Sequence, residues 1–509
     1  MEQSVDVDIA TGLSRAELLD RVADAEALIV RSATRVDREM IAAAPKLKVV
    51  GRAGIGVDNI DIEAATAAGV MVINAPDANT VSAAEHTMAM LLAQARRIPE
   101  ADASLRSGLW ERKRLQGVEL HGKTLGILGL GRIGAMVAQR AAAFGMGLVV
   151  HDPFINEERA KRLGARVVDF DELLRVSDFV TLHLPRTAET TALLDAEAFS
   201  KMKPGARIVN VARGGIIDEE ALASAIRDGT IAGAALDVFD NEPATESPLF
   251  DLPEVVVTPH LGASTREAQD KAGLSIAEDV VQALDGRIVQ SVLNVDIGGA
   301  IPEEARTSVR LAEKLGRIFA MFSSGLPDEL TVSVKGQDVE GALQLIALGA
   351  TKGAMEAASD EPVSYVNAPV LAAHRGLVVH RTSDAAEGDY RFLVRLSGVV
   401  EGRPRTVAGT VMGNRGPVLV EVDRFEIEAP ITPHMVLIRN TDMPGVIGAV
   451  GTYLGNAEVN IAEMAVGNYE DHGAIGAMMG LSVSRAISDA EVDDIASIDG
   501  VLAVRYLSV

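Results

Sequence analysis

Residues 124–134 read TLGILGLGRIG, an apolar strand that runs into a glycine-rich turn and then into the start of a helix. Glycines in such a turn permit a tight bend and let a pyrophosphate approach backbone N–H groups at the helix N-terminus. Asp152 follows the next apolar segment, where a carboxylate would accept hydrogen bonds from an adenosine ribose and repel a 2′-phosphate. The stretch therefore predicts binding of NAD rather than NADP, with a purely structural turn as the alternative. The predicted cofactor contacts are Gly129, Gly131, Arg132, Ile133, Gly134 and Asp152.

On both sides of this stretch, short apolar runs alternate with Ala-rich helical segments, the pattern of a parallel sheet. Three runs (27–30, 47–50 and 70–73) precede a long helix from near Ser82 past Met90. Six more (124–130, 148–151, 179–184, 207–211, 232–238 and 255–258) precede a helix at 265–285. We predict a Rossmann-type doubly wound cofactor domain, 98–262, inserted into a smaller flavodoxin-like α/β substrate domain, 1–97 and 263–297, with hinges near Arg97 and Ala263.

The pattern changes after about residue 300. Strands at 330–334, 391–399, 405–412 and 418–422 predict an antiparallel α+β domain over 298–432. Residues 433–509 predict β-α-β-β-α-β, with strands at 435–440, 461–466, 474–482 and 501–507 and helices after Pro444 and Ser488.

Composition excludes several classes of function. A chain of 509 residues exceeds one hydrophobic core, so three or four domains are expected. No cysteine is present, which excludes disulfides, thiolate metal sites and a Cys nucleophile, and we predict no metal site. The net charge of −24 disfavours nucleic acid and anionic membrane surfaces as partners. No apolar run approaches the ~20 residues needed to span a bilayer, and MEQSVDVDIA lacks the features of a signal peptide. We predict a cytoplasmic protein.

Three segments place a reactive side chain just after a predicted strand, at the edge where α/β sheets form their clefts. They carry Arg213, Glu242 and His260. His260 is the natural base for the proton of a secondary alcohol, since a histidine titrates near working pH. Glu242 would hold the imidazole and favour its charged form. Arg213 offers a planar fork for a substrate carboxylate. Taken singly, the histidine could be structural and the glutamate part of a turn.

In this order, GLGRIG (129–134), HDP (151–153), NVARGGIIDE (210–219), LDVF with EP (236–243) and TPHLGAST (258–265) resemble the D-isomer-specific 2-hydroxyacid dehydrogenases. The resemblance implies that Arg213, Glu242 and His260 form the catalytic set. It also implies that Asp237 lies near the nicotinamide carboxamide and that Gly262 is a further cofactor contact.

GRAGIGVDNID (51–61), NAP (74–76), SAAEH (82–86) and WERK (110–113) resemble the 3-phosphoglycerate dehydrogenases of that family, which implies 3-phosphoglycerate as substrate and a place in serine biosynthesis. Arg52, Gly54, Ile55 and Gly56 are the expected substrate contacts, and the backbone N–H groups of this loop could cradle a carboxylate. By the same resemblance, Arg112 reaches the phosphate bound by a neighbouring subunit. For each arginine, a solvated surface charge is the alternative.

The C-terminal segments strengthen this resemblance. SYVNAP (364–369) resembles part of the intervening domain of the long-form enzymes, and 433–509 resembles an ACT regulatory domain. The resemblance implies a homotetramer and a serine effector held by Asn440, Asp442 and Asn460, although these residues could be only caps and turn formers. Relatives begin with a further strand, so we expect either a start assigned too late or an incomplete domain edge. The alternatives are another enzyme of the family, of the glyoxylate or hydroxypyruvate type, and an NADH-sensing corepressor. Reduction of 2-oxoglutarate is an expected side activity.

Overall fold

The computed structural model describes residues 5–155, 157–298, 303–336, 340–384, 390, 392–471 and 474–509. Its contacts divide the chain into two compact units. The first unit comprises Met1–Gly51, Asp58–Ile73 and Glu278–Val509, and the second comprises Arg52–Val57 and Asn74–Ala277. The predicted domain boundaries at residues 97 and 263 differ from these limits and stay predictions.

The second unit is built on a seven-stranded sheet of order β10-β9-β8-β7-β4-β5-β6, in which neighbouring strands pair in parallel. The strand order reverses between β4 and β7, which is the arrangement of a doubly wound dinucleotide-binding sheet. The predicted doubly wound fold is thus confirmed. The strands are β4 Thr124–Leu128, β5 Gly147–His151, β6 Ala165–Val167, β7 Phe179–Leu182, β8 Ala206–Asn210, β9 Ile231–Leu236 and β10 Val255–Val257.

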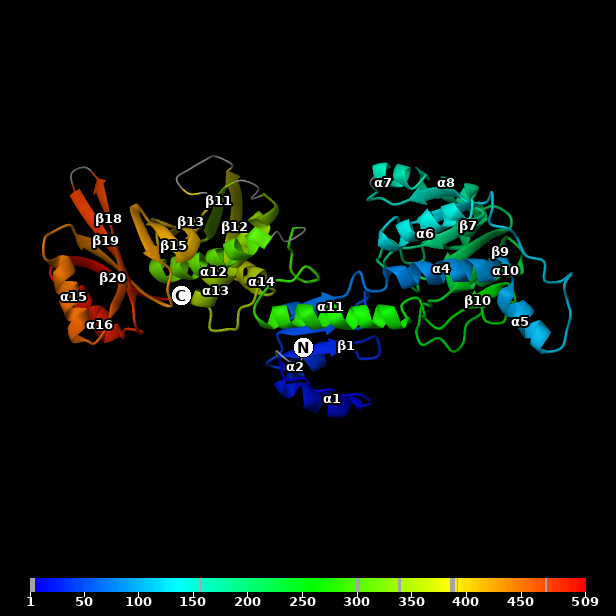
Figure 1. Ribbon diagram of the computed structural model, residues 1–509, viewed down its shortest axis with the longest axis horizontal. Coiled ribbons are helices and arrows are strands. Elements are labelled where there is room, and N and C mark those ends of the chain that lie inside the picture. The colour runs from blue at the N-terminus through cyan, green and yellow to red at the C-terminus, as the bar shows by residue number, and fades with distance from the viewer. Residues whose placement is uncertain are drawn as a thin grey trace. The chain divides into compact units, whose positions relative to one another are not determined.

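Helices cover both faces of this sheet (Figure 1). One apolar cluster joins the strands to α4 and α6, and the other joins them to α8, α9 and α10. Neighbouring strand residues such as Ile127 and Leu128 enter opposite clusters, as side chains do on a pleated strand. The helices are α4 Thr80–Ala95, α5 Ile98–Arg106, α6 Arg132–Ala143, α7 Glu157–Arg162, α8 Phe170–Val176, α9 Ala196–Lys201, α10 Glu219–Arg227 and α11 Arg266–Leu284, which continues into the first unit.

The number of strands predicted for this sheet, six, is wrong. The missed strand, β6, contributes only three residues, and two of them, Arg166 and Val167, are exposed at the sheet edge. A short edge strand lacks the continuous apolar run that marks the buried strands, so hydrophobic pattern alone did not reveal it.

The first unit contains a three-stranded sheet of order β1-β2-β3, whose strands alternate with helices. Aspartate side chains cap the N-termini of α2 and α3. Asp61, for example, accepts a hydrogen bond from the Ala64 N–H at the start of α3. The elements are α1 Arg15–Arg21, the 3₁₀ turn η1 Val22–Asp24, β1 Ala27–Val30, α2 Arg38–Ala43, β2 Val49–Arg52, α3 Ile62–Ala67 and β3 Met71–Asn74.

The same unit carries a six-stranded sheet of order β12-β11-β13-β14-β15-β16, with α12 and α13 packed against it (Figure 1). The prediction of four antiparallel strands is wrong in two respects. First, the prediction omits two strands, β16 and the exposed, polar edge strand β12. Second, the β11–β12 pair is parallel rather than antiparallel. Residue 391, the start of one predicted strand, lies outside the described residues. The elements are α12 Glu303–Ser323, β11 Glu329–Gly336, η2 Glu340–Ala342, α13 Leu343–Ala358, α14 Ala368–His374, β12 Val378–Asp384, β13 Phe392–Val400, β14 Arg403–Met412, η3 Gly413–Arg415, β15 Gly416–Val422 and β16 Phe425–Pro430.

The C-terminal segment forms a four-stranded antiparallel sheet of order β18-β19-β17-β20. The predicted β-α-β-β-α-β order is confirmed, and an apolar cluster joins both helices to the sheet. The elements are β17 His434–Thr441, α15 Val446–Asn456, β18 Ile461–Asp471, β19 Ala474–Val483, α16 Asp489–Ala496 and β20 Val501–Ser508.

Candidate active site

The glycine-rich turn follows β4, at the point where the strand order of the sheet reverses. A Cβ on Gly129 would lie 2.7 Å from the His183 carbonyl oxygen, and one on Gly134 would lie 2.1 Å from the Gly129 carbonyl oxygen. Both glycines are therefore required by packing of the turn itself. Gly131 differs, because a Cβ there would meet no described atom within 4 Å.

Gly131 is the N-cap of α6, and no side chain caps this helix end by a hydrogen bond. The first N–H groups of a helix have no partner within the helix, so they are available to an anion. Open space beside Gly131 and an uncapped helix end together fit the pyrophosphate of a dinucleotide.

Asp152, at the end of β5, supports this turn. Its Oδ2 accepts a hydrogen bond from the Leu130 N–H at 2.8 Å, and its Oδ1 accepts one from the Phe154 N–H at 2.9 Å. Arg132 pairs with Asp77 at 3.1 Å, and Ile133 packs against the apolar cluster around α6. The carboxylate of Asp152 thus orders the loop, and its contact with a ribose stays a prediction.

The three predicted catalytic residues follow neighbouring parallel strands, so the sheet brings their loops to the same edge. Arg213 follows β8, Glu242 follows β9 and His260 follows β10. A Cβ on Gly214 would lie 1.7 Å from the Phe239 carbonyl oxygen, so glycine permits the loops of Arg213 and Glu242 to meet. The Asn210 side chain fixes the first loop by donating to the Arg213 carbonyl at 2.9 Å and accepting from the Ala212 N–H at 3.0 Å.

His260 and Glu242 form the central pair of this edge. The Nδ1 of His260 lies 2.6 Å from Glu242 Oε2, and Glu242 Oε1 accepts a hydrogen bond from the Phe239 N–H at 3.1 Å. The hydrogen bond to Glu242 raises the pKa of His260, while burial of the imidazole and, to a smaller extent, the positive charge of Arg213 oppose that rise. Burial would raise the pKa of Glu242, but the hydrogen bonds from His260 and Phe239 outweigh it and lower the pKa. The imidazole is thus oriented with Nε2 left for a substrate.

Asp237, predicted to contact the nicotinamide carboxamide, lies fully buried beneath the loop that carries His260. Its carboxylate accepts hydrogen bonds from the N–H groups of Leu261 at 2.7 Å and Gly262 at 2.8 Å, and from the Thr258 hydroxyl. Burial would raise the pKa of Asp237, but these hydrogen bonds and that with His86 lower it. The structure therefore places Asp237 as a support for the loop, and its cofactor contact, like that of Gly262, stays a prediction.

His86 was not among the predicted site residues. Its Nε2 lies 3.2 Å from Asp237 Oδ1 and 3.1 Å from the Thr258 hydroxyl. The motif SAAEH was visible in the sequence, but its histidine lies more than 150 residues from Asp237 along the chain, so only the fold could reveal their contact.

Asn74 was also missed, although it belongs to the motif NAP. Its side-chain Nδ2 donates to the Ile55 carbonyl at 2.7 Å, and the Ala75 N–H donates to the Gly54 carbonyl at 3.0 Å. These bonds hold the predicted substrate loop. A Cβ on Gly54 would collide with the Arg52 guanidinium, so that side chain folds back over its own loop.

The remaining predicted substrate residues are Gly56, which is half-buried in the same loop, and Arg112, which is exposed in the segment after α5. The proposed role of Arg112 toward a neighbouring subunit stays a prediction.

The structure separates the three predicted regulatory residues by their exposure. Asn440 is buried and donates to the Thr441 carbonyl at 2.9 Å, whereas Asp442 and Asn460 are exposed. Among the described residues, no hydrogen bond or ion pair joins the three side chains. Their role in effector binding stays a prediction.

The described residues contain neither a membrane-spanning helix nor a cluster of metal ligands. None of their helices has both the length and the apolar character needed to cross a membrane. Nor do they contain a group of three or more histidine, cysteine, aspartate or glutamate side chains suited to a metal ion.

Comparison with known proteins finds similarity to 2-hydroxyacid dehydrogenases along most of the chain. Residues 88–262 match the family described as D-isomer specific 2-hydroxyacid dehydrogenase, NAD binding domain, and residues 305–423 match the D-3-phosphoglycerate dehydrogenase intervening domain. The chain is 48% identical to a D-3-phosphoglycerate dehydrogenase of Mycobacterium leprae over 90% of its own length and 87% of the relative. It is 43% identical to the D-3-phosphoglycerate dehydrogenase of Synechocystis, over 98% and 90%. The crystal structure of TT0316 protein from Thermus thermophilus matches at a TM-score of 0.53 and 40% identity, covering 57% of this chain and 94% of that one.

Proposed function

The chain belongs to the D-3-phosphoglycerate dehydrogenases, within the D-isomer specific 2-hydroxyacid dehydrogenase family, and we propose that it oxidises 3-phosphoglycerate to 3-phosphohydroxypyruvate, the first step of L-serine biosynthesis. NAD is the cofactor of this family's matched domain, and when bound it supplies the acceptor for the hydride that leaves C2 of the substrate. The observation that carries the proposal is the His260–Glu242 pair at 2.6 Å, beside the charge of Arg213.

In the proposed reaction, the Nε2 of His260 removes the proton of the C2 hydroxyl. Glu242 stabilises the imidazolium that results, which is the reason for its place on Nδ1. Arg213 binds the substrate carboxylate and polarises the C2 oxygen, since a guanidinium can donate to both. Asp237 and His86 act as positioning residues that keep the His260 loop in place.

The loop of residues 52–57 is proposed to bind the rest of the substrate. The backbone around Gly54 and Gly56 would meet the carboxylate, and Arg52 would meet the phosphate. Asn74 and Ala75 hold this loop by two of its carbonyl groups, and the Gly54 N–H donates to the Arg52 carbonyl at 2.8 Å, so the N–H groups that follow Gly54 are the ones proposed to meet the carboxylate.

The proposed base is tested by His260→Ala. We expect turnover to fall by ~10²–10⁴-fold while NADH binding stays nearly intact, as loss of a general base requires. The matched control is His380→Ala, because His380 pairs with Glu329 at 3.4 Å on the edge strand β12, far along the chain from the site. Unchanged turnover in His260→Ala would remove the base from the proposal.

The proposed substrate is tested by an NADH assay over a panel of 2-hydroxy and 2-oxo acids. Arg52→Ala should raise KM for the phosphorylated substrate far more than KM for 2-oxoglutarate, the expected side substrate. Equal effects on both would take Arg52 out of the phosphate site. A preference for glyoxylate or hydroxypyruvate would favour the other enzymes of the family.

We further propose a homotetramer in the cytoplasm and inhibition by serine at the C-terminal sheet domain, as the sequence resemblance to ACT domains suggests. Light scattering would give the mass of the assembly. Titration of serine into the assay, with Asn460→Ala beside the parent chain, would test the effector site. Activity that is indifferent to serine would end this part of the proposal.

A further inference from the structure

Arg186, in the segment that follows β7, contacts the loop that carries one of the proposed catalytic residues. Its Nη2 lies 2.9 Å from Asp240 Oδ1, and its Nη1 donates to the Asp240 carbonyl at 3.5 Å. Asp240 belongs to the loop after β9 and lies two residues before Glu242. The planar fork of an arginine can make both contacts at once, so Arg186 holds Asp240 by its side chain and its backbone.

The same guanidinium lies against the loop that carries Arg213. A Cβ on Gly215 would lie 2.6 Å from Arg186 Cζ and 2.8 Å from Asp240 Oδ1, so the ion pair packs directly on the Gly215 backbone. Gly215 has a φ of 75°, a conformation that favours glycine. The segment of Arg186 makes a second contact there, since the Ala192 N–H donates to the Gly215 carbonyl at 2.8 Å. Arg186 therefore touches both loops.

Asp240 is also held from its other side. Its N–H donates to Oε1 of Glu219, the first residue of α10, at 2.8 Å. The next residue toward β9, Phe239, donates its N–H to Glu242 Oε1 at 3.1 Å. A shift of Asp240 would therefore move Phe239, and with it the carboxylate that orients His260.

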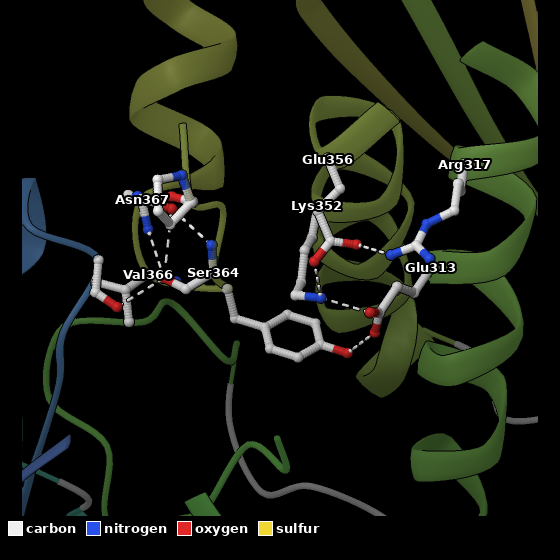
Figure 2. A network of polar contacts seen from close by, with 10 residues as sticks. Glu313, Arg317, Lys352, Glu356, Ser364, Val366 and Asn367 are labelled. Carbon is white, nitrogen blue, oxygen red and sulfur yellow. Dashed lines mark hydrogen bonds and ion pairs between the residues drawn. The ribbon is translucent and has the colours of Figure 1, made fainter. Parts of the chain in front are cut away.

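The pair of Arg186 and Asp240 is exposed to solvent, with 44% and 50% of the two side chains accessible. Exposed ion pairs add little to stability, because water and salt screen them and two side chains must be ordered. The ion pairs of the first unit in Figure 2 differ, since Lys352 lies between two glutamates with its side chain only 13% exposed. Loss of the exposed pair should leave folding nearly unchanged, which separates its effect on activity from an effect on stability.

We propose that Arg186 is a positioning residue for the dehydrogenase reaction and clamps the loops of Arg213 and Glu242 together through Gly215 and Asp240. The roles of those two loops rest on the proposed function, whereas the clamp itself does not. With the clamp in place, Arg213 meets the substrate carboxylate from a fixed loop. A misplacement of about 1 Å can cost ~10²-fold in rate when the group orients a substrate.

The effect on the reaction is tested by Arg186→Leu in the full chain. We expect kcat/KM for 3-phosphoglycerate to fall by about 5–100-fold, mainly through a higher KM, because Arg213 binds the substrate. The dissociation constant of NADH and the Tm should stay nearly unchanged. An unchanged kcat/KM overturns the proposal. An equal loss of NADH affinity also overturns it, because Arg186 would then act on the cofactor.

The control is Arg166→Leu in the same unit. Arg166 is an exposed arginine on the edge strand β6, and it pairs with Glu172 at 2.5 Å. This variant loses the same group and the same kind of ion pair, so its kinetic constants should match those of the parent chain. A fall in kcat/KM as large as that in Arg186→Leu would make the effect one of charge alone and overturn the clamp.

The route through Asp240 is tested by a double-mutant cycle. Asp240→Asn removes the charge that Arg186 meets but keeps the N–H that donates to Glu219. If the two side chains act together, Arg186→Leu should lower kcat/KM by a much smaller factor in the Asp240→Asn chain than in the parent chain. Equal factors in the two chains would overturn the route.

The clamp is tested without substrate by hydrogen exchange of the Ala192 and Asp240 amides. Each donates across the clamp, to the Gly215 carbonyl and to the Glu219 carboxylate respectively. We expect several-fold faster exchange of both in Arg186→Leu and no change in Arg166→Leu. Unchanged exchange in Arg186→Leu overturns the clamp. A parent chain that does not oxidise 3-phosphoglycerate would end the proposed function, whereas this exchange measurement would still decide whether the clamp exists.

Discussion

Gly131 and Gly134 lie three residues apart in one turn, and their surroundings differ in a way that two alanine substitutions can test. In Gly134→Ala, the new Cβ would lie 2.1 Å from the Gly129 carbonyl oxygen, so a backbone must move by about 1 Å to reach the shortest contacts that proteins show. Forcing an extra carbon into a packed site costs about 1–3 kcal/mol. For a domain of this size, each kcal/mol lowers Tm by roughly 2–4 °C.

In Gly131→Ala, nothing within 4 Å obstructs the new Cβ, and the φ of −65° and ψ of −158° are accessible to alanine. The cofactor-free protein should therefore keep its Tm or gain slightly, because alanine has less freedom than glycine in the unfolded chain. The methyl group would, however, occupy the approach to the uncapped end of α6. Losing one or two hydrogen bonds to a charged group should weaken NADH binding by about 10–100-fold.

Thermal unfolding without cofactor and fluorescence titration with NADH would be measured for both variants. Gly147→Ala is the control, since a Cβ there meets only the Thr124 hydroxyl, at an ordinary 3.8 Å. We expect Gly134→Ala to lose stability and affinity together, and Gly131→Ala to lose affinity alone. Wild-type NADH affinity in Gly131→Ala would refute the reasoning that its open side faces the pyrophosphate.

Three further outcomes are expected. Glu242→Gln removes the carboxylate that raises the pKa of His260. Because oxidation needs the neutral imidazole, the midpoint of the variant's pH–kcat/KM profile should move down toward about 6.5. An unmoved midpoint would contradict the pairing of Glu242 with His260. Asp237→Asn puts an amide donor against the Leu261 or Gly262 N–H, so the free energy of unfolding should fall by about 1–3 kcal/mol, checked by thermal denaturation. Asp152→Ala should weaken NADH binding about tenfold or more by releasing the Leu130 N–H, measured by fluorescence titration against the parent chain.

The buried strands of the parallel sheet could be predicted because each is a continuous apolar run between glycine-rich or polar turns. Edge strands could not. β6 and β12 are exposed for most of their length, so their residues follow no apolar pattern. In contrast, β16 alternates buried and exposed residues from Phe425 onward, and that alternation was present in the sequence.

At the site, the convergence of the loops that carry Arg213, Glu242 and His260 could be predicted because each loop follows a recognisable strand. Their supports were not. His86 and Asn74 act through bonds to Asp237 and Ile55, partners that the fold alone brings near. Asp152 is a similar case. The motif spacing predicted the position of its carboxylate, but it did not predict that the carboxylate accepts hydrogen bonds from the Leu130 and Phe154 N–H groups.

The net charge of the chain and the local charge of the proposed active site have opposite signs. A net charge of −24 repels an anionic substrate at long range, yet salt screens such repulsion beyond about 8 Å at physiological ionic strength. At the proposed active site, an anionic substrate would meet the local cations Arg52 and Arg213. Short-range recognition of this kind depends on geometry rather than on mean charge, because a guanidinium discriminates by the direction of its N–H groups. An acidic protein can therefore bind a small acidic metabolite, because recognition depends on the cations within contact distance rather than on the net charge of the chain.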